Sequence, residues 1–432
     1  MKVINAVLCP GCGSLCDDNE VYVEDNKIVK VRTDCAISTS KFLNFNKDRN
    51  TTPLIRVDGE LKPTTLEAAI ERVARILVEA EYPLIYGWSL TSCEAQKKGV
   101  ELAEEVGGVI DNTTTVCHGP SILGVQDFGE PTCSLGEVRA RADLIIYWGC
   151  NPSSAHTRHM KRYSSLSKGR FRLPEQRKVV VVDVRKTPTA RNANIFIQVK
   201  PNQDYELMAA LKMMLQNEEI EEQEVAGVPV EQIEELAELM RSCEFGVLFF
   251  GLGLTMSEGK ERNIDGAITL VRELNRWTKF AIMPMRGHYN VTGANKVFTW
   301  QTGYPYAVDF SRGYPRYEPG DTTAVDVLSR GYNDATLVVA SDPVANLPKD
   351  AVKHLCSKPL AVIDPHISLT AFMADVVIPC AFVGIEEGGT AYRMDGVGMI
   401  LKKVVEPPEG ILPDTQILDL ILKRVRELKG GR

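Results

Sequence analysis

Four cysteines near the start of the chain are the residues with the clearest chemistry. Cys9, Cys12 and Cys16 lie in one short stretch, and Cys35 follows a pattern over residues 21–31 that is typical of a β-hairpin. Such a hairpin would return Cys35 to the loop that carries the other three. Four thiolates suit either a structural zinc ion or an iron–sulfur cluster. The spacing therefore predicts a metal site and leaves the metal open.

A second candidate site combines a cysteine–histidine pair with a distant arginine. Cys117 precedes His118 just after a candidate strand, and it could be a nucleophile, a metal ligand or a buried core thiol. Residue type alone favours the third alternative, a buried core thiol, because free cysteines are among the most buried residues. Arg286 follows the apolar segment Phe280–Met283 and stands beside Gly287. An arginine there can present a bidentate fork to a carboxylate or phosphate, although a surface loop explains it equally well.

Nucleotide-binding fingerprints are incomplete. Gly251 and Gly253 are not followed by the third glycine of a dinucleotide motif, since Met256 occupies that place. Asp183, however, ends an apolar segment and is followed closely by Arg185. That pair is typical of a Rossmann-like strand that meets a nucleotide.

Other possible metal ligands are weaker candidates. His156 and His159 would lie one turn apart on a helix, but two histidines without a third ligand are weak evidence for zinc. We expect the remaining cysteines to be structural: Cys93, Cys133, Cys150, Cys243, Cys356 and Cys380.

Apolar strands that alternate with helical patterns must position these residues. Thr64 and Glu67 fit a capping box at the start of the first helix. The alternation predicts parallel α/β sheets, and 432 residues suggest two or three domains. The candidate strands include 84–88, 144–148, 179–182, 247–250, 337–340, 361–363 and 376–378, and the helical patterns include 205–215, 263–277 and 415–428.

Composition excludes several classes of protein. The net charge of −7 argues against a nucleic-acid-binding surface, which would usually be basic. No apolar run reaches the roughly 18 residues of a membrane helix, and no signal peptide is apparent, so we expect a cytoplasmic protein. Eleven cysteines in such a chain argue for metal ligands and free thiols rather than a disulfide framework.

Several motifs, taken in chain order, resemble those of the molybdopterin oxidoreductase family, of the formate dehydrogenase type. They run from the cysteine motif through Gly149-Cys150-Asn151-Pro152, Asp183 with Arg185, Gly251-Leu252-Gly253 and Arg286-Gly287 with Asn290 to Ala374-Asp375 with Glu387. Longer segments are similar to the B subunits of the formylmethanofuran dehydrogenases of methanogenic archaea: CPGCGSLCDD, YGWSLTSCEAQ, VIDNTTTVCHGPS, YWGCNPSSAHTRH, FFGLGLT, PMRGHYNVTG, TGYPYAVDFS and GTAYRMDGV.

The resemblance implies a formate dehydrogenase/DMSO reductase-like α/β fold. A small 4Fe–4S domain would cover residues 1–55, followed by a discontinuous α/β domain over 56–135 and 336–432. A second α/β domain, over 136–335, would be inserted into it. Larger relatives add a C-terminal β-barrel domain that this chain is expected to lack, and a partner, the D subunit, would supply it.

The resemblance also implies roles for individual residues. Cys9, Cys12, Cys16 and Cys35 would bind a 4Fe–4S cluster. Cys117 would be the protein thiolate on a tungsten or molybdenum ion held by two molybdopterin guanine dinucleotides, His118 would assist proton transfer, and Arg286 would hold the substrate oxygens. Candidate contacts to the dinucleotides are Gly149, Asn151, Asp183, Arg185, Gly251, Gly253, Gly287, Asn290 and Asp375. The place of a relay lysine in many relatives is taken by Ile37, and Lys41 is a candidate substitute.

The implied activity is the reversible two-electron reduction of CO2 to formate, the first step of methanogenesis from CO2. An amidohydrolase-like zinc protein, the A subunit, would condense the formate with methanofuran. Further partners would be the C subunit, together with ferredoxin-like iron–sulfur subunits, and no nucleic acid or membrane would be involved. Two alternatives remain: a stand-alone or differently partnered formate dehydrogenase, and a non-catalytic iron–sulfur electron-transfer scaffold.

Overall fold

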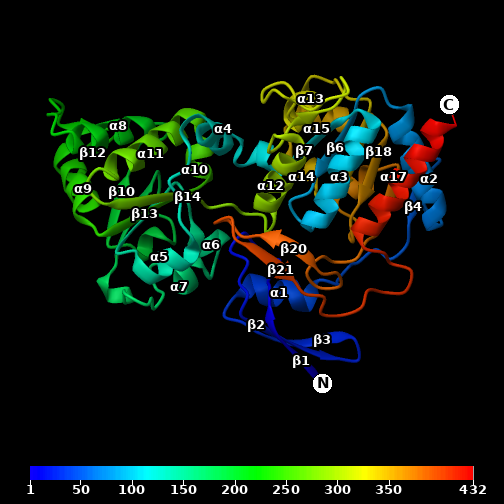
Figure 1. Cartoon of the computed structure of the whole chain (residues 1–432), viewed down its shortest axis with the longest axis horizontal. Helices are drawn as coiled ribbons and strands as arrows, with labels where there is room; N and C mark the ends of the chain where they lie inside the picture. The colour runs from blue at the N-terminus through cyan, green and yellow to red at the C-terminus, as the bar shows by residue number, and fades with distance from the viewer. Residues whose placement is uncertain (432) are drawn as a thin grey trace. The chain divides into compact units, whose positions relative to one another are not determined.

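The computed structural model describes residues 1–431, which form two compact units (Figure 1). Unit 2 consists of Cys117–Gly287 and Met394–Val397, and the rest of the described chain forms unit 1. The inserted part is thus shorter than the expected 136–335. Strand β15 (Val308–Asp309) pairs with a strand of the unit 1 sheet, and residues 1–55 also group with unit 1.

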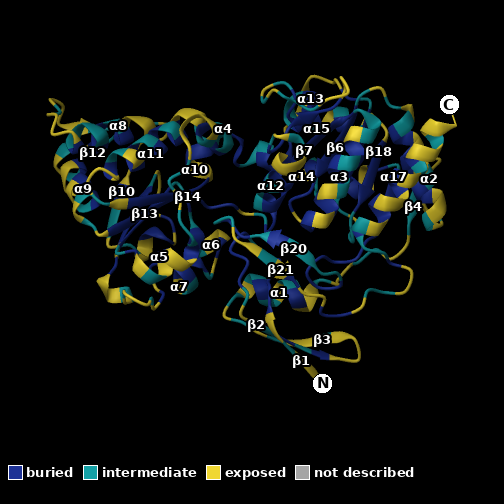
Figure 2. Cartoon of the chain, viewed as in Figure 1, coloured by how far each residue is buried: buried dark blue, intermediate teal, exposed yellow. Residues whose placement is uncertain are grey.

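Unit 2 is built on a parallel sheet of five strands in the order β10-β9-β8-β13-β14. The chain starts in the middle of this sheet, runs to one edge and returns to the other, so the order reverses between β8 and β13. The strands are β8 (Leu144–Trp148), β9 (Lys178–Asp183), β10 (Ile195–Gln198), β13 (Phe245–Phe250) and β14 (Lys279–Pro284). Both β8 and β13 are buried along their whole length, because helices cover both faces of the sheet (Figure 2).

The helices of unit 2 pack on the sheet through alternate strand residues. Ile146, Trp148, Leu248 and Phe250 face a core formed with α8, α9 and α11. The helices are α4 (Gly119–Phe128), α5 (Leu135–Arg141), α6 (Pro152–Ala155), α7 (His159–Tyr163), α8 (Asp204–Leu215), α9 (Val230–Ser242), α10 (Leu252–Thr255) and α11 (Glu261–Leu274). A short hairpin, β11 (Glu224–Val225) with β12 (Val228–Pro229), precedes α9.

Unit 1 contains a nine-stranded sheet with a parallel centre and antiparallel edges. In order, its strands are β16 (Arg316–Tyr317), β15, β7 (Val109–Asn112), β6 (Pro83–Gly87), β17 (Ala335–Val339), β18 (Leu360–Ile363), β19 (Val376–Ile378), β4 (Leu54–Val57) and β5 (Glu60–Pro63).

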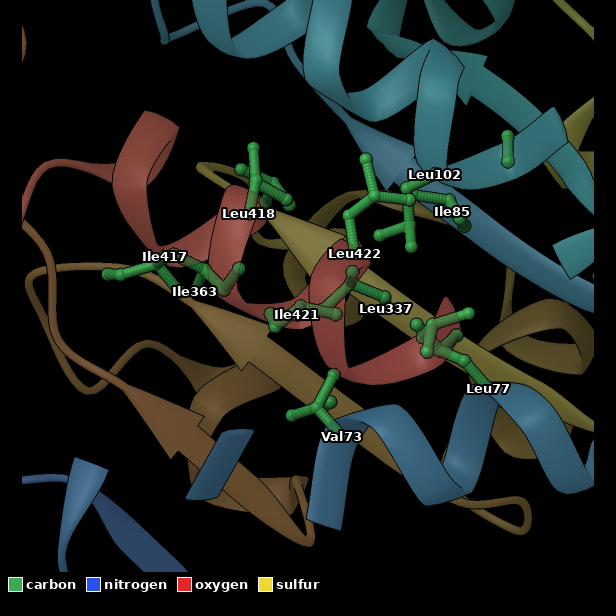
Figure 3. Close-up of a cluster of buried hydrophobic side chains, with 14 of the residues drawn as sticks. Val73, Leu77, Ile85, Leu102, Leu337, Ile363, Ile417, Leu418, Ile421 and Leu422 are labelled. Carbon is green, nitrogen blue, oxygen red and sulfur yellow. The ribbon is translucent and has the colours of Figure 1, made fainter. Parts of the chain in front are cut away.

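Helices cover both faces of this sheet as well. On one face, α17 (Asp414–Gly430) and α2 (Leu66–Glu79) bury Ile421, Leu77 and their neighbours against Leu337 of β17 (Figure 3). The further helices are α3 (Cys93–Val106) and α12 (Val291–Thr302), and α13 (Ala324–Ser329), α14 (Pro343–Asn346), α15 (Lys349–Leu355) and α16 (Leu369–Met373).

A small sheet at the start of unit 1 carries the cysteine loop. Strands β1 (Lys2–Val7), β2 (Asn19–Glu24) and β3 (Lys27–Arg32) are antiparallel, and α1 (Ala36–Asn44) follows directly. Asp25 and Asn26 have φ values of 47° and 59°, which a tight hairpin turn requires. The predicted hairpin is therefore confirmed. Later in unit 1, β20 (Gly389–Tyr392) pairs with β21 (Gly398–Leu401).

Two local expectations were wrong. The cap of α2 is Thr65, whose hydroxyl accepts from the Ala68 N–H, so Thr64 is not the capping residue. His156 and His159 do not lie on one helix, because α6 ends at Ala155 and α7 begins at His159. Among residues 1–431, none of the helices has the length and apolar character needed to cross a membrane.

Candidate active site

Cys117 and His118 lie immediately before α4, where the chain enters unit 2. The hydroxyl of Thr255 donates to the Cys117 carbonyl oxygen at 2.7 Å, which ties the pair to α10. Nδ1 of His118 lies 2.9 Å from Oγ of Ser121, and the ring stands edge-on to Phe250 at 6.2 Å between centroids. These contacts fix the orientation of the imidazole.

The other ring nitrogen of His118 is available. Nε2 is buried and has no hydrogen-bond partner within the described part of the chain. Burial, with a smaller contribution from the nearby Arg286, lowers the pKa of His118 to about 3, while the Met285 backbone acts in the opposite direction. The imidazole is therefore neutral near neutral pH.

Arg286 stands two residues beyond the end of β14 and is almost completely buried. Burial lowers the pKa of its guanidinium, while Glu130 and Cys117 act in the opposite direction. Burial raises the pKa of Cys117 to about 11, and Arg286 opposes that shift. The three candidates, Cys117, His118 and Arg286, are thus close enough for their charges to interact, although His118 and Arg286 lie 168 positions apart in the sequence.

The loops that follow the strands of unit 2 meet at the carboxyl edge of its sheet. In open α/β sheets, ligands bind outside the carboxyl ends of the strands, where the strand order reverses. In unit 2 that point lies between β8 and β13. Gly149 follows β8 and Gly251 follows β13, so both predicted dinucleotide contacts lie there.

Three glycines at this point are required by backbone packing. A Cβ on Gly253 would lie 2.5 Å from Cα of Gly149, and a Cβ on Gly251 would lie 2.6 Å from Cβ of Cys150. Gly149 also has a φ of 56°, which favours glycine. The two loops can approach each other only because side chains are absent. Gly253 is exposed and Gly149 is half-buried, so a ligand can approach the backbone at these two positions.

Asn151, Asp183 and Arg185 lie on neighbouring loops of the same edge. The side-chain oxygen of Asn151 accepts from the Thr189 hydroxyl at 2.7 Å, which joins the loops after β8 and β9. Asp183 ends β9, and its carboxylate accepts from the Arg185 N–H at 3.2 Å. Burial raises the pKa of the Asp183 carboxyl. Asp183 occupies the position from which an acidic residue can contact a ribose.

Asn290, a predicted contact in unit 1, is fully occupied by structural bonds. Its side chain donates to the Thr91 carbonyl at 2.8 Å and accepts from the Tyr392 N–H at 2.8 Å. Asp375 precedes β19 and accepts from the Leu360 N–H at 2.9 Å, at the amino edge of the parallel strands. The geometry therefore gives both side chains a structural role. Gly287 is exposed, and a Cβ there would meet nothing within 4 Å.

The loop with the first three cysteines is closed by backbone and side-chain bonds. The Cys9 N–H donates to the Cys16 carbonyl at 2.9 Å, and the Asn19 side chain donates to the same carbonyl at 2.9 Å. Burial raises the pKa of Cys9 to about 12, with smaller contributions from nearby Cys12 and Cys35. Cys35 is the residue before α1, so the hairpin and this helix bring it within reach of the loop.

Within residues 1–431, no group of three or more His, Cys, Asp or Glu side chains is arranged to hold a metal ion.

Lys41, on α1, is partly buried beside Cys9 and Asp364. Burial lowers the pKa of its ammonium group, and both neighbours raise it. Its Nζ also lies 5.7 Å from the ring centroid of Phe382.

Known proteins with similar sequences indicate the family of this chain. The family model of the molybdopterin oxidoreductases matches residues 49–424. The B subunit of the tungsten-containing formylmethanofuran dehydrogenase 2 of Methanocaldococcus jannaschii is 54% identical, over 99% of this chain and 100% of that protein. The protein of the same description in Methanococcus maripaludis is 50% identical over 99% of this chain and 100% of its own length.

The chain belongs to the molybdopterin oxidoreductase family, among the B subunits of formylmethanofuran dehydrogenase. Solved structures share the fold of this B subunit. Acetylene hydratase from Pelobacter acetylenicus has a TM-score of 0.75 at 14% identity, covering 98% of this chain and 69% of that chain. A chain of the formyltransferase/hydrolase complex of Methylorubrum extorquens, in complex with methylofuran, has a TM-score of 0.71 at 20% identity, covering 88% of this chain and 100% of that chain.

Two residues that support the site in this B subunit were missed by sequence reasoning. Ser121 contacts Nδ1 of His118, and Thr255 holds the Cys117 carbonyl. Both lie in segments that carried the family resemblance. A third, His156, was considered only as a zinc ligand, but its Nε2 lies 2.8 Å from the Arg286 carbonyl oxygen.

Proposed function

We propose that this B subunit performs the reversible two-electron reduction of CO2 to formate within a formylmethanofuran dehydrogenase. The observation that carries the proposal is the grouping of Cys117, His118 and Arg286 beside the carboxyl edge of the unit 2 sheet. A soft metal ligand, an available imidazole nitrogen and a buried guanidinium are what this reaction needs. A scaffold that only transfers electrons has no need of the three together.

The residues fit a tungsten- or molybdenum-bis-pterin group. Burial keeps Cys117 a neutral thiol when no metal is bound, and its soft sulfur, once deprotonated, would be the protein ligand of the metal. The glycine-lined loops at Gly149, Gly251 and Gly253, with Asp183 nearby, suit the dinucleotides. When bound, the metal–pterin group supplies the two-electron redox chemistry. The tungsten named in both close relatives favours tungsten here.

Arg286 binds and orients the substrate in this proposal. Its guanidinium can hold the two oxygens of formate, or of CO2 as negative charge develops on it, through charge-assisted hydrogen bonds. Because Arg286 is buried, water competes weakly for these bonds.

His118 handles the proton. Oxidation of formate releases CO2, two electrons and one proton, and reduction consumes the same. Nε2 of His118 is the ring atom that can take up or return that proton. A negative charge on the neighbouring Cys117 sulfur would raise the pKa of His118 from its low value toward the working pH.

Cys9, Cys12, Cys16 and Cys35 would hold a 4Fe–4S cluster, which would supply electron transfer. The chain works in an assembly of several subunits, as the names of its relatives suggest. In that assembly, the A subunit receives the formate and condenses it with methanofuran, and the pterin site is completed by the D subunit. The remaining partners are iron–sulfur subunits and the C subunit.

The test is metal analysis and activity of the complex, purified anaerobically with wild-type or variant B subunit. We expect one tungsten or molybdenum per B subunit, together with dye-linked formate oxidation, and both should be lost in Cys117→Ala. Cys356→Ser, at a half-buried thiol outside the site, is the matched control and should retain both. A Cys117→Ala complex with full metal content and activity would overturn the proposal.

A further inference from the structure

A histidine from a neighbouring loop is bonded to the backbone of Arg286. Nε2 of His156 lies 2.8 Å from the Arg286 carbonyl oxygen, and both residues are buried. A carbonyl oxygen only accepts hydrogen bonds, so Nε2 must carry a proton. Burial lowers the pKa of His156, so the ring is neutral near neutral pH and donates from Nε2.

The backbone is held differently on the two sides of Arg286. Just before it, the Met285 N–H donates to the Phe250 carbonyl at 2.7 Å, which ties the end of β14 to the end of β13. Just after it, Gly287 is exposed and has open space where a side chain would be. The bond from His156 therefore restrains the carbonyl side of Arg286, next to the open position at Gly287.

His156 is itself held firmly. Its N–H donates to the Pro152 carbonyl at 2.9 Å, and its own carbonyl accepts from the His159 N–H at 2.7 Å. Asn151, at the start of the same loop, is tied to Thr189 through the hydroxyl bond at 2.7 Å. The loop after β8 is thus a rigid support, and His156 connects that support to Arg286.

We propose that His156 is a positioning residue for Arg286: its Nε2–H holds the backbone so that the guanidinium faces the substrate oxygens. The inference rests on the proposed function only in naming those oxygens as those of formate or CO2. Bidentate recognition depends on orientation, and small displacements of a positioned group reduce rates strongly. The buried bond from His156 therefore has a function: it holds the backbone of Arg286 in one position.

The chain offers a matched control three residues away. His159 is equally buried, but neither of its ring nitrogens has a hydrogen-bond partner in residues 1–431. Its ring packs edge-on against Phe249 at 4.9 Å between centroids. Phenylalanine can make the same ring contact, so His159→Phe tests the loss of a buried imidazole without the loss of a bond to Arg286.

The experiment compares His156→Phe, His156→Gln and His159→Phe in the full complex. Two quantities are measured: kcat and KM for formate with a dye acceptor, and hydrogen–deuterium exchange of a peptide spanning residues 284–290. We expect His156→Phe to lower kcat/KM by about 10- to 100-fold and to speed exchange in that peptide. His156→Gln, whose amide N–H can reach the place of Nε2, should restore much of both. His159→Phe should change neither.

The outcomes separate this inference from the proposed function. If the wild-type complex has no formate activity but exchange at residues 284–290 rises only in His156→Phe, the proposed function fails and the positioning of Arg286 stands. If exchange and kcat/KM are unchanged in His156→Phe, or change equally in His159→Phe, the inference is overturned. A shifted pH profile that His156→Gln does not rescue would mean that His156 moves protons, which also overturns it.

Discussion

Gly149 and Gly253 are in direct backbone contact at the carboxyl edge of the unit 2 sheet. The Gly253 N–H donates to the Gly149 carbonyl at 2.8 Å, which joins the loop after β8 to the loop after β13. The two glycines lie 104 positions apart in the sequence, yet each leaves the space that the other needs. The strand order reverses between these two loops, so this contact shapes the place where a dinucleotide is expected.

A methyl group at this contact should disrupt it. In Gly253→Ala the new Cβ would lie 2.5 Å from Cα of Gly149, and backbone cannot yield as a flexible side chain can. We expect a loss of stability of about 1–3 kcal/mol and reduced pterin content. Thermal melting and the guanine nucleotide released by acid measure the two effects. Gly136→Ala, on α5, is the control, because its Cβ would meet only Ser134 Oγ at 3.6 Å. Equal pterin content in both variants would contradict the prediction.

Local pattern was enough to predict most elements of the fold. The strands and the hairpin before Cys35 were predicted because alternation, apolar runs and turn residues act over a few neighbouring positions. The boundary of unit 2 was not predicted, because it depends on which sheet the distant strand β15 joins. The helix cap was predicted one residue too early, at Thr64 instead of Thr65, because two neighbouring threonines have the same propensity for the N-cap position.

The sequence was enough to predict which residues belong to the candidate site, but not which contacts they make. Cys117, His118 and Arg286 were found through motif resemblance, and the structure brings them together in unit 2. Motif order could not show that the carboxylate of Asp375 accepts a hydrogen bond from the Leu360 N–H. Nor could it show the bond from His156 to Arg286, because a backbone carbonyl leaves no signature in sequence.

Loss of one cysteine of the N-terminal loop should remove the iron of this subunit. Cys12→Ala leaves three thiolates, and a 4Fe–4S cluster is normally held by four. We expect about four fewer irons per B subunit, measured by metal analysis of the anaerobically purified complex. Cys133→Ser, at a half-buried thiol elsewhere in the chain, should keep its iron. Unchanged iron, with one zinc lost instead, would show a structural zinc site.

Arg286→Lys should weaken the handling of formate although the positive charge is kept. A lysine ammonium is a point charge and cannot form the two parallel bonds of a guanidinium. We expect kcat/KM for formate to fall by about 100-fold, in steady-state assays with a dye acceptor. Arg276→Lys is the control, because Arg276 is exposed and pairs only with the nearby Glu273 at 2.9 Å among the ion pairs of the described chain. Equal kinetics of the two variants would rule out a bidentate role for Arg286.

Buried neutral histidines should make unit 2 sensitive to acid. Burial lowers the pKa of His159 to about 3, so below pH 6.5 the unfolded chain binds a proton that the folded chain does not. The free energy of unfolding therefore falls with decreasing pH, by up to about 1.4 kcal/mol per pH unit for each such histidine, until about pH 3. Carboxyls of unit 2 whose pKa is raised by burial, such as that of Asp183, act in the opposite direction, so the wild type alone does not isolate the effect.

His159→Phe isolates the contribution of one histidine. The variant removes a group that must stay uncharged and leaves every carboxyl in place, so its stability relative to the wild type should rise as the pH falls from 7 to 5. Melting temperatures of the two complexes, measured side by side across that range, give the difference directly. We expect the difference between the two curves to become constant near neutral pH, where the imidazole is neutral in both the folded and the unfolded chain. A constant offset at every pH would mean that His159 contributes only through packing against Phe249, and that its pKa in the folded chain is not lowered.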